Sequence, residues 1–297
     1  MKQAWIQRPE GGGRVPIRMV IRLAQACGRR FMRGVLYPIT LYFLLRRGPE
    51  RRASRAYLIR LLGTANWLKI AKHIHYFSAV TLDRVYLLRE NYRRFDVRCF
   101  GLEDLRAFTA AGRGVLLFGA HVGSFDVLRS LAAQQPDLPF RAVIDVGQNP
   151  AFSEIFNELN PKLAESIINS RRDGISTAFD IQAALDSRSI VSMLVDRARP
   201  GNATTSVDFI GSPAPFPNSP WLLASILQVP VVLCFGLYRG GNRYDLYFEK
   251  FAEAIDIPRR DREAALDSTI RRYSERLEYY VRLAPYNWFN FYDFWKP

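Results

Sequence analysis

The pattern of apolar and polar positions changes along this chain between the spacing of helices and that of buried strands. Short apolar runs predict strands at residues 95–100, 115–120, 140–145, 166–169, 190–195, 231–237 and 244–249. Apolar positions at helical spacing predict helices within 51–92 and at 102–111, 125–133, 151–159, 175–186, 221–227 and 262–282. Because strands and helices alternate from residue 95 onward, we expect an α/β fold with a single layered sheet flanked by helices.

One stretch, residues 199–220, interrupts this alternation with many Gly, Pro and Asn residues. We expect a loop that encloses one short strand at Ser206–Ile210. The prolines after Gly211 restrict the backbone, so the loop could form a rigid apolar wall of a pocket for an apolar ligand. An ordinary structural loop would explain the same residues.

The first part of the chain combines a helical apolar pattern with most of the positive charge. Of a formal net charge of +14 on 297 residues, +12 lies in residues 1–60, which hold fourteen Lys or Arg and two Glu. Arginines in residues 14–33 recur near helical spacing opposite an apolar side, as in a basic helix that lies in a lipid headgroup layer. The apolar run Gly34–Leu45 follows, and its twelve residues are fewer than the roughly twenty that span a bilayer.

These features predict a membrane-associating basic and apolar helical anchor at residues 1–50 and a folded domain at 51–297. A helix packed on the domain, with solvated arginines, would explain the same pattern. Nucleic acid fits less well as the anionic partner, because no helix-turn-helix, zinc or RNA-recognition signature accompanies the charge. The apolar run contains Pro38 and lacks a cleavage site after it, so we do not expect a secretory signal. The cytoplasmic side of a membrane is therefore expected, where anionic lipids attract arginine clusters.

His121 is the most informative polar residue of the chain. It follows the predicted strand 115–120, and Asp126 comes five residues later, across a turn that contains Gly123 and Ser124. A neutral imidazole can take a proton from a hydroxyl near physiological pH, and a carboxylate on its other nitrogen would fix its tautomer. Catalytic groups of open α/β sheets lie at such strand ends. We expect Ser124 to cap the following helix, and a structural histidine is the alternative interpretation of His121.

The other two histidines, His73 and His75, lie in a predicted helix with no acidic residue between them. We expect them to pack within the fold or to lie at its surface. No Cys or carboxylate cluster completes a metal site around them, so no metal centre is expected. The three cysteines are far apart in the sequence, which suits a reducing compartment.

Two later segments add candidates. Val195, Asp196 and Arg197 leave the end of a predicted strand, where the acid and the arginine would either face the same crevice as His121 or form a solvated turn. The tail Ala284–Trp295 is dense in aromatic residues, which usually indicates a core or an interface. A belt at a membrane edge is the alternative.

Together these segments resemble the lysophospholipid acyltransferase superfamily, and within it the bacterial lipid A lauroyl/myristoyl acyltransferase-like family. The similarity runs from about Gly34 to the end of the chain. The defining motif of His, four residues and Asp is matched by His121 and Asp126. Further segments similar to family motifs are Val195–Arg197, Phe209–Phe216, Ala284–Trp295 and, more loosely, Asn169–Arg172.

The resemblance implies a glycerolipid acyltransferase-like fold and an O-acyltransferase without a cofactor. An acyl chain would pass from acyl carrier protein or coenzyme A to a hydroxyl of a lipid or glycolipid, at the cytoplasmic face of the bacterial inner membrane. His121 would be the general base and Asp126 would orient its ring, with no covalent intermediate. The backbone amides of the turn would hold the oxyanion, and arginines would bind phosphate groups. The substrate-binding residues implied in this way are Gly123, Ser124, Arg171, Arg172, Asp196 and Arg197.

Two other functions fit the same residues. A thioesterase or other hydrolase would use the pair of His121 and Asp126 on water, and an added lipid acceptor would then not divert the product from free fatty acid. A non-catalytic membrane-binding module would keep its lipid binding when His121 is replaced.

Overall fold

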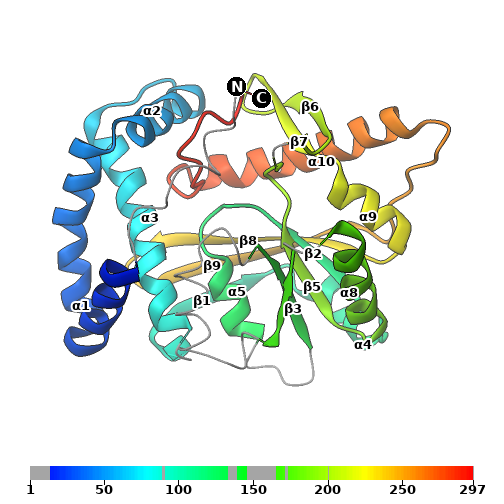
Figure 1. The fold of residues 1–297 in the computed structure, drawn as a ribbon, viewed down its shortest axis with the longest axis horizontal. Helices are drawn as coiled ribbons and strands as arrows, with labels where there is room; N and C mark the ends of the chain where they lie inside the picture. The colour runs from blue at the N-terminus through cyan, green and yellow to red at the C-terminus, as the bar shows by residue number, and fades with distance from the viewer. Residues whose placement is uncertain are drawn as a thin grey trace.

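A seven-stranded mixed sheet lies at the centre of the fold (Figure 1). The computed structural model describes residues 14–88, 91–132, 139–145, 165–170, 173–199 and 201–296. Within these ranges the strands of the sheet are β1 (Asp96–Phe100), β2 (Val115–Gly119), β3 (Phe140–Ile144), β4 (Ile167–Asn169), β5 (Ile190–Leu194), β8 (Val231–Gly240) and β9 (Arg243–Ala252). Their order is β1-β9-β8-β2-β5-β3-β4, and neighbours are parallel except in the β8–β9 hairpin. The predicted strands are confirmed, while the predicted helix at 151–159 lies outside the described residues.

β2 shows why the central strands are unbroken apolar runs in the sequence. All of its residues are buried, because helices cover both faces of the sheet. Successive side chains of a strand point to opposite faces. Leu116 and Phe118 accordingly belong to one hydrophobic cluster, and Val115 and Leu117 belong to another.

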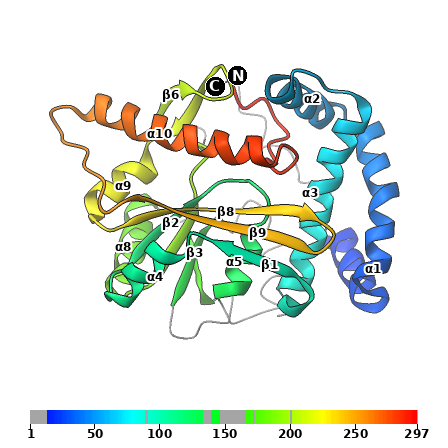
Figure 2. The ribbon, with the colours of Figure 1, turned by 180° about the vertical axis from the view of Figure 1, so that it is seen from behind.

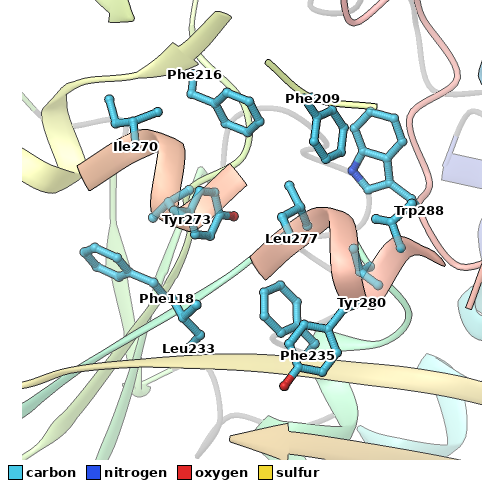
Figure 3. Close-up of a cluster of buried hydrophobic side chains, with 14 of the residues drawn as sticks. Phe118, Phe209, Phe216, Leu233, Phe235, Ile270, Tyr273, Leu277, Tyr280 and Trp288 are labelled. Carbon is cyan, nitrogen blue, oxygen red and sulfur yellow. The ribbon is translucent and has the colours of Figure 1, made fainter. Parts of the chain in front are cut away.

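Helices on the two faces complete these clusters. They are α4 (Glu103–Ala110), α5 (Phe125–Ala132), α8 (Gly174–Asp186), α9 (Ser219–Leu227) and α10 (Arg262–Leu283), in agreement with the predicted helices. α8, α9 and α10 contribute to the cluster of Phe118, whereas α4 and α5 contribute to that of Leu117. Figure 3 shows the first cluster, in which Tyr273 and Tyr280 of α10 lie over Phe118 and Phe235 of the sheet.

Three helices stand beside one end of the sheet (Figure 2). They are α1 (Arg14–Arg46), α2 (Gly48–Leu62) and α3 (Trp67–Leu87), and a short 3-10 turn at Asn91–Arg94 follows them. α1 is interrupted at Gly28, whose φ of 74° and ψ of 167° are not helical. Its inner side packs on α3 through the buried side chains of Met32, Leu36 and Leu44. The N-terminal segment therefore contributes to the hydrophobic core as well as to the surface.

α1 also has apolar side chains that are exposed. The large exposed ones between residues 34 and 45, termed here the α1 outer face, are Tyr37, Leu41, Tyr42 and Leu45. No charged residue lies between residues 34 and 45, whereas Arg30 before this stretch and Arg46 after it are exposed. None of the described helices is both long enough and apolar enough to cross a bilayer. The α1 outer face is thus an apolar surface with basic residues at both ends.

The proline-rich stretch 199–220 differs from the prediction of one strand within a loop. β6 (Thr204–Asp208) and β7 (Pro213–Pro217) form an antiparallel two-stranded ribbon. Proline occupies every second position of β7, which leaves the N–H groups of Ala214 and Phe216 for the ladder. The alternation of the prolines therefore permits a strand where their number indicated a loop.

Candidate active site

His121 lies in the turn between β2 and α5, at the carboxyl edge of the parallel strands. The turn is short, because β2 ends at Gly119 and α5 begins at Phe125. Gly123 makes it possible: its φ is 64°, and a Cβ on it would lie 1.9 Å from the carbonyl oxygen of Gly236. The turn approaches β8 so closely that only glycine fits at this position.

The C-terminal tail holds the same turn. Phe289 donates its backbone N–H to the carbonyl oxygen of His121 at 2.9 Å, and Gly123 donates to the carbonyl oxygen of Asn287 at 2.8 Å. The side chain of Asn287 in turn pairs with the backbone N–H and C=O of Tyr238 in β8. Trp288 lies within the hydrophobic cluster shown in Figure 3. The aromatic tail is therefore part of the core, as predicted.

Asp196 is the partner of the His121 ring. Its Oδ1 lies 2.7 Å from the ring Nδ1, and its Oδ2 accepts the backbone N–H of His121 at 3.2 Å. The two residues meet because β2 and β5 are neighbours in which Gly119 lies opposite Leu194, two positions before each of them. Asp196 is completely buried, whereas 32% of the His121 side chain is exposed. The ring can therefore reach a substrate, and the carboxylate of Asp196 cannot, which corrects its expected contact with substrate.

The surroundings of His121 keep its ring neutral and the Asp196 carboxylate ionised. Burial lowers the pKa of His121 from its ordinary value, and the charges of Arg197 and Arg84 lower it further against the opposing effect of Asp196. Burial alone would raise the pKa of Asp196, but His121 and Arg197 hold it at about 2. At neutral pH the ring donates its Nδ1 proton to the carboxylate, and Nε2 is left with a lone pair that can accept a proton.

Asp126 does not contact the His121 ring, contrary to the expectation that it orients the imidazole. Its Oδ2 lies 2.5 Å from Nε of Arg84, and its Oδ1 lies 3.7 Å from Nη1 of Arg129. Asp126 is the second residue of α5, and its side chain is directed to Arg84 on α3. Among the described residues, Asp196 occupies the position on Nδ1 that the sequence assigned to Asp126.

The backbone amides of Gly123 and Ser124 are engaged as well, which corrects their expected role as oxyanion donors. Gly123 donates to Asn287 and Ser124 donates to the carbonyl oxygen of Gly236, each at 2.8 Å. Both bonds fasten the turn to its neighbours. The Ser124 hydroxyl is buried and has no hydrogen-bond partner in the described part of the chain, so the predicted helix cap does not form.

Arg197 follows Asp196 directly after β5. Its positive charge acts on the His121 ring. Its Nη2 donates to the carbonyl oxygen of Phe289 at 2.8 Å, and its guanidinium lies over the ring of Tyr292. The tail therefore holds both the backbone of His121 and the side chain of Arg197.

The other expected phosphate ligands, Arg171 and Arg172, lie outside the described residues. The carboxyl ends of β3, β4 and β5 are joined by Arg199, which the sequence analysis did not select. Its guanidinium lies 2.9 Å from Asp145 and 2.8 Å from Ser170, so it joins the ends of β3, β4 and β5. Only the strand order reveals that these three ends are adjacent.

Arg84 is the second charged residue that sequence reasoning missed. It lies in a predicted helix among many other arginines, and nothing in its spacing distinguishes it. The packing of α3 against α5 brings it to Asp126. The sequence alone therefore could not identify Arg84 as the partner of Asp126.

His73 has the structural contacts that the sequence led us to expect. It is fully buried, with Nδ1 2.8 Å from Oγ of Ser54 and Nε2 2.9 Å from the carbonyl oxygen of Trp288. Burial lowers the pKa of His73 to about 4, so the ring is neutral at physiological pH. His75 stacks on Tyr37 of α1. In the described ranges, no three His, Cys, Asp or Glu side chains are grouped to hold a metal ion.

A partly exposed histidine at the carboxyl edge of an α/β sheet, held by a buried carboxylate and flanked by arginines, is the arrangement of an acid–base enzyme. Residues 76–297 match the family model described as bacterial lipid A biosynthesis acyltransferase. The match covers most of the chain, and the chain belongs to this family, as its resemblance predicted. A comparison with curated proteins found no match. The protein is accordingly an acyltransferase that acts on a lipid.

Proposed function

We propose that this protein transfers an acyl chain from an acyl-thioester to a hydroxyl of a lipid or glycolipid, with His121 as the general base. The donor is acyl carrier protein or coenzyme A. The observation that carries the proposal is the pair of His121 and Asp196, in which a neutral, partly exposed imidazole has its Nδ1 2.7 Å from a buried carboxylate. Family membership supports acyl transfer to a lipid.

In this mechanism the acceptor hydroxyl gives its proton to Nε2 of His121 as its oxygen attacks the thioester carbonyl carbon. A C–O bond forms, and the carbonyl oxygen takes on a negative charge. The C–S bond then breaks, and the leaving thiolate takes the proton back from the imidazolium. Asp196 stabilises the imidazolium between these steps because its carboxylate remains ionised. The attack is direct, so no acyl-enzyme forms.

Asp126 belongs to the same machinery in a different position from the one expected. Its carboxylate binds Arg84 of α3 and Arg129 of α5 and so holds these two side chains in place. Two different carboxylates thus serve the site: Asp196 orients the base, and Asp126 holds Arg84 and Arg129.

Arginines supply binding for phosphate. A guanidinium matches phosphate geometry, and both the phosphopantetheine of the donor and many glycolipids carry phosphate. Arg197 is held next to the base by the tail. Arg171 and Arg172 follow β4, whose end at Asn169 lies at the carboxyl edge. We assign these three residues to phosphate groups of the substrates.

The α1 outer face attaches the protein to the cytoplasmic face of the bacterial inner membrane. A helix that is apolar on one side and basic at its ends lies in the interface, with its apolar side about 5–10 Å deep. Arginines near an anionic leaflet each contribute about 1 kcal/mol of attraction. The exposed side chains of Tyr37, Leu41, Tyr42 and Leu45 and the exposed Arg30 and Arg46 support this attachment.

An added acceptor separates transfer from hydrolysis. The purified protein in mixed micelles receives an acyl-[acyl carrier protein] or acyl-coenzyme A, with or without a bacterial inner-membrane lipid extract, and the products are identified by mass spectrometry. We expect an acylated lipid and a release of thiol that depends on the acceptor. Equal thiol release without acceptor, with free fatty acid as the product, would identify a hydrolase. Lipid binding without thiol release from either donor would identify a binding module.

A further inference from the structure

We propose that Asn287 is a positioning residue for acyl transfer: its side-chain amide fastens the C-terminal tail to β8, and the tail keeps the His121 turn in place for catalysis. The inference rests on the proposed function, because it concerns the placement of the proposed base. It adds a residue near the end of the chain, which acts through the backbone that carries His121.

β8 has an open edge where the His121 turn and the tail meet it. β2 pairs with β8 only as far as Leu233, whereas β8 continues to Gly240. Beyond Leu233 this edge has backbone N–H and C=O groups that β2 no longer covers. The carbonyl oxygen of Gly236 accepts the N–H of Ser124 there at 2.8 Å. The turn therefore attaches to β8 just beyond the end of β2.

The side chain of Asn287 covers the next position of this edge. Its Oδ1 accepts the backbone N–H of Tyr238 at 2.7 Å, and its Nδ2 donates to the carbonyl oxygen of the same residue at 3.1 Å. Paired residues of antiparallel strands exchange the same two bonds through their backbones. The Asn287 amide thus takes the place of a neighbouring strand and joins the tail to β8.

The backbone of the tail passes this attachment on to the turn. The carbonyl oxygen of Asn287 accepts the N–H of Gly123 at 2.8 Å, and Phe289 donates its N–H to the carbonyl oxygen of His121 at 2.9 Å. Between these two bonds the tail and the turn form an isolated antiparallel bridge. Asn287 therefore contacts β8 with its side chain and the turn with its backbone.

Burial makes both bonds of the Asn287 amide costly to lose. Only 1% of the residue is exposed, so water does not readily replace either bond. A carboxylate at this position would lack the donor, and an apolar side chain would lack both groups. Either change would leave a polar group of Tyr238 unpaired and would free the tail and the turn to shift relative to β8.

The alignment of the His121 ring depends on the position of the turn. Its Nδ1 lies 2.7 Å from Asp196, which follows β5, so the ring is aligned only while the turn keeps its distance from β5. A base must lie about 2.6–3.2 Å from the atom that gives up the proton. A displacement of about 1 Å can lower the rate about 10²-fold. Asn287 contributes to catalysis by preventing such a displacement.

The tail has other anchors, so the chain should stay folded when the Asn287 side chain is replaced. Nε2 of His73 lies 2.9 Å from the carbonyl oxygen of Trp288, and the hydroxyl of Tyr57 donates to the carbonyl oxygen of Pro285 at 2.7 Å. Trp288 is also buried in the core. These contacts join the tail to α2 and α3, whereas Asn287 joins it to β8.

Replacement of Asn287 by Leu removes both side-chain hydrogen bonds and retains the approximate size of the residue. We expect kcat for acyl transfer to fall about 10²-fold, with little change in KM for the thioester, because the base moves and the substrate contacts remain. Ser274→Ala is the matched control, since Ser274 is also buried and its hydroxyl donates to the carbonyl oxygen of Asp208 at 2.8 Å. It should retain wild-type kcat. An unchanged kcat in Asn287→Leu would overturn the proposal.

The proton between Nδ1 of His121 and Asp196 distinguishes this role from a general loss of stability. A proton in such a short bond to a carboxylate resonates at low field in the ¹H NMR spectrum, and His121→Ala identifies the signal by removing it. The signal should shift or broaden in Asn287→Leu and should stay unchanged in Ser274→Ala. A fall in kcat with an unchanged signal would show that Asn287 does not act on the ring, and would overturn the proposal.

Hydrogen exchange in the wild type tests the same contacts without a substitution, and so covers a variant that does not fold. The backbone N–H groups of Gly123 and Tyr238 should exchange slowly, because both are bonded to Asn287. Exchange of either group at the rate of a free amide would overturn the proposal. A fully active His121→Ala would refute the proposed function, whereas an inactive His121→Ala beside a fully active Asn287→Leu would refute only this inference.

Discussion

At the scale of single residues, the arginines and the carboxylate around His121 have opposite effects on its pKa. The charges of Arg197 and Arg84 lower the pKa of the ring together with burial, and Asp196 raises it. A base works in its neutral form, so activity is lost as the pH falls through this pKa. The acid limb of kcat/KM should therefore have its midpoint below the ordinary histidine value of about 6.5.

We predict that Asp196→Asn lowers kcat about 10³- to 10⁴-fold, because an amide neither fixes the reactive tautomer nor stabilises the imidazolium. The acid limb should also move to lower pH, since the carboxylate that raises the pKa of His121 is gone. Thiol release measured from pH 5 to 8 in wild type and variant tests both points. A limb that moves to higher pH would mean that another group sets the ionisation of the base.

The sequence was sufficient to select His121, because a histidine after an apolar strand and before a helix is a local pattern. It was not sufficient to select the partner of the ring. Asp196 is 75 positions away from His121 and reaches it only because β2 and β5 are neighbours. Asp126 is close in sequence but points to Arg84. Local spacing therefore selected the histidine but not the carboxylate that contacts its ring.

At the scale of elements, His73 joins α2, α3 and the tail that holds the His121 turn. Its ring is bound on one side by Ser54 of α2 and on the other by the carbonyl oxygen of Trp288. Burial lowers its pKa to about 4, whereas in the unfolded chain it is about 6.5. Between these values the unfolded chain binds the extra proton, so folding weakens as the pH falls through this window.

We predict that His73→Gln reduces the pH dependence of stability. In the wild type this histidine should remove about 3 kcal/mol of the free energy of unfolding between pH 6.5 and 4. The variant should be less stable at pH 7 and should lose less on acidification, as measured by urea unfolding at several pH values. His121 and His75 titrate in both proteins, so the difference between the two curves isolates His73. Parallel curves would show that its ring is not buried as described.

The α1 outer face is tested by substitutions that leave the core intact. Deleting the helix would also remove the buried Met32 and Leu36 and would leave Asp83 without the 2.7 Å ion pair to Arg29. Leu41→Glu with Leu45→Glu changes only exposed positions of α1.

We predict that this double variant loses co-sedimentation with vesicles of anionic phosphatidylglycerol, because insertion of the apolar face is replaced by repulsion. Ile175→Glu with Ile226→Glu, at exposed positions of α8 and α9, is the matched control and should still sediment. Added salt should weaken wild-type binding without abolishing it, since only the charge contribution is screened. Loss of binding in the control alone would move the membrane contact to α8 and α9.

Most elements could be predicted because each has its own period of apolar residues. The exceptions have physical reasons. β7 was not predicted because prolines usually interrupt strands. Here they occupy alternate positions, so the residues between them can still donate their N–H groups to β6. In α1 the sequence showed an apolar run but could not show which side packs on α3. Met32 and Leu36 face inward while Leu41 and Leu45 face outward, and only the packing partner decides between them.

At the scale of the whole molecule, the order of the strands determines where chemistry occurs. β2 and β5 end side by side and bring His121 to Asp196, and the β8–β9 hairpin receives the tail that holds the turn. Alternation of strands and helices predicted the α/β class. It could not predict that β9 runs antiparallel to β8 with β1 beside it at the edge, because strand order depends on contacts between distant segments.

The central claim is that His121 is the base of an acyl transfer, and the most direct test is the rate of acylated lipid formation by His121→Ala with a saturating thioester donor. We predict that the rate falls about 10²- to 10⁴-fold, because the variant lacks the group that accepts the proton. The melting temperature should stay close to that of the wild type, because the ring is partly exposed. His75→Ala, which changes a histidine outside the site, should remain active. Acylated lipid formed by folded His121→Ala at the wild-type rate would contradict the account.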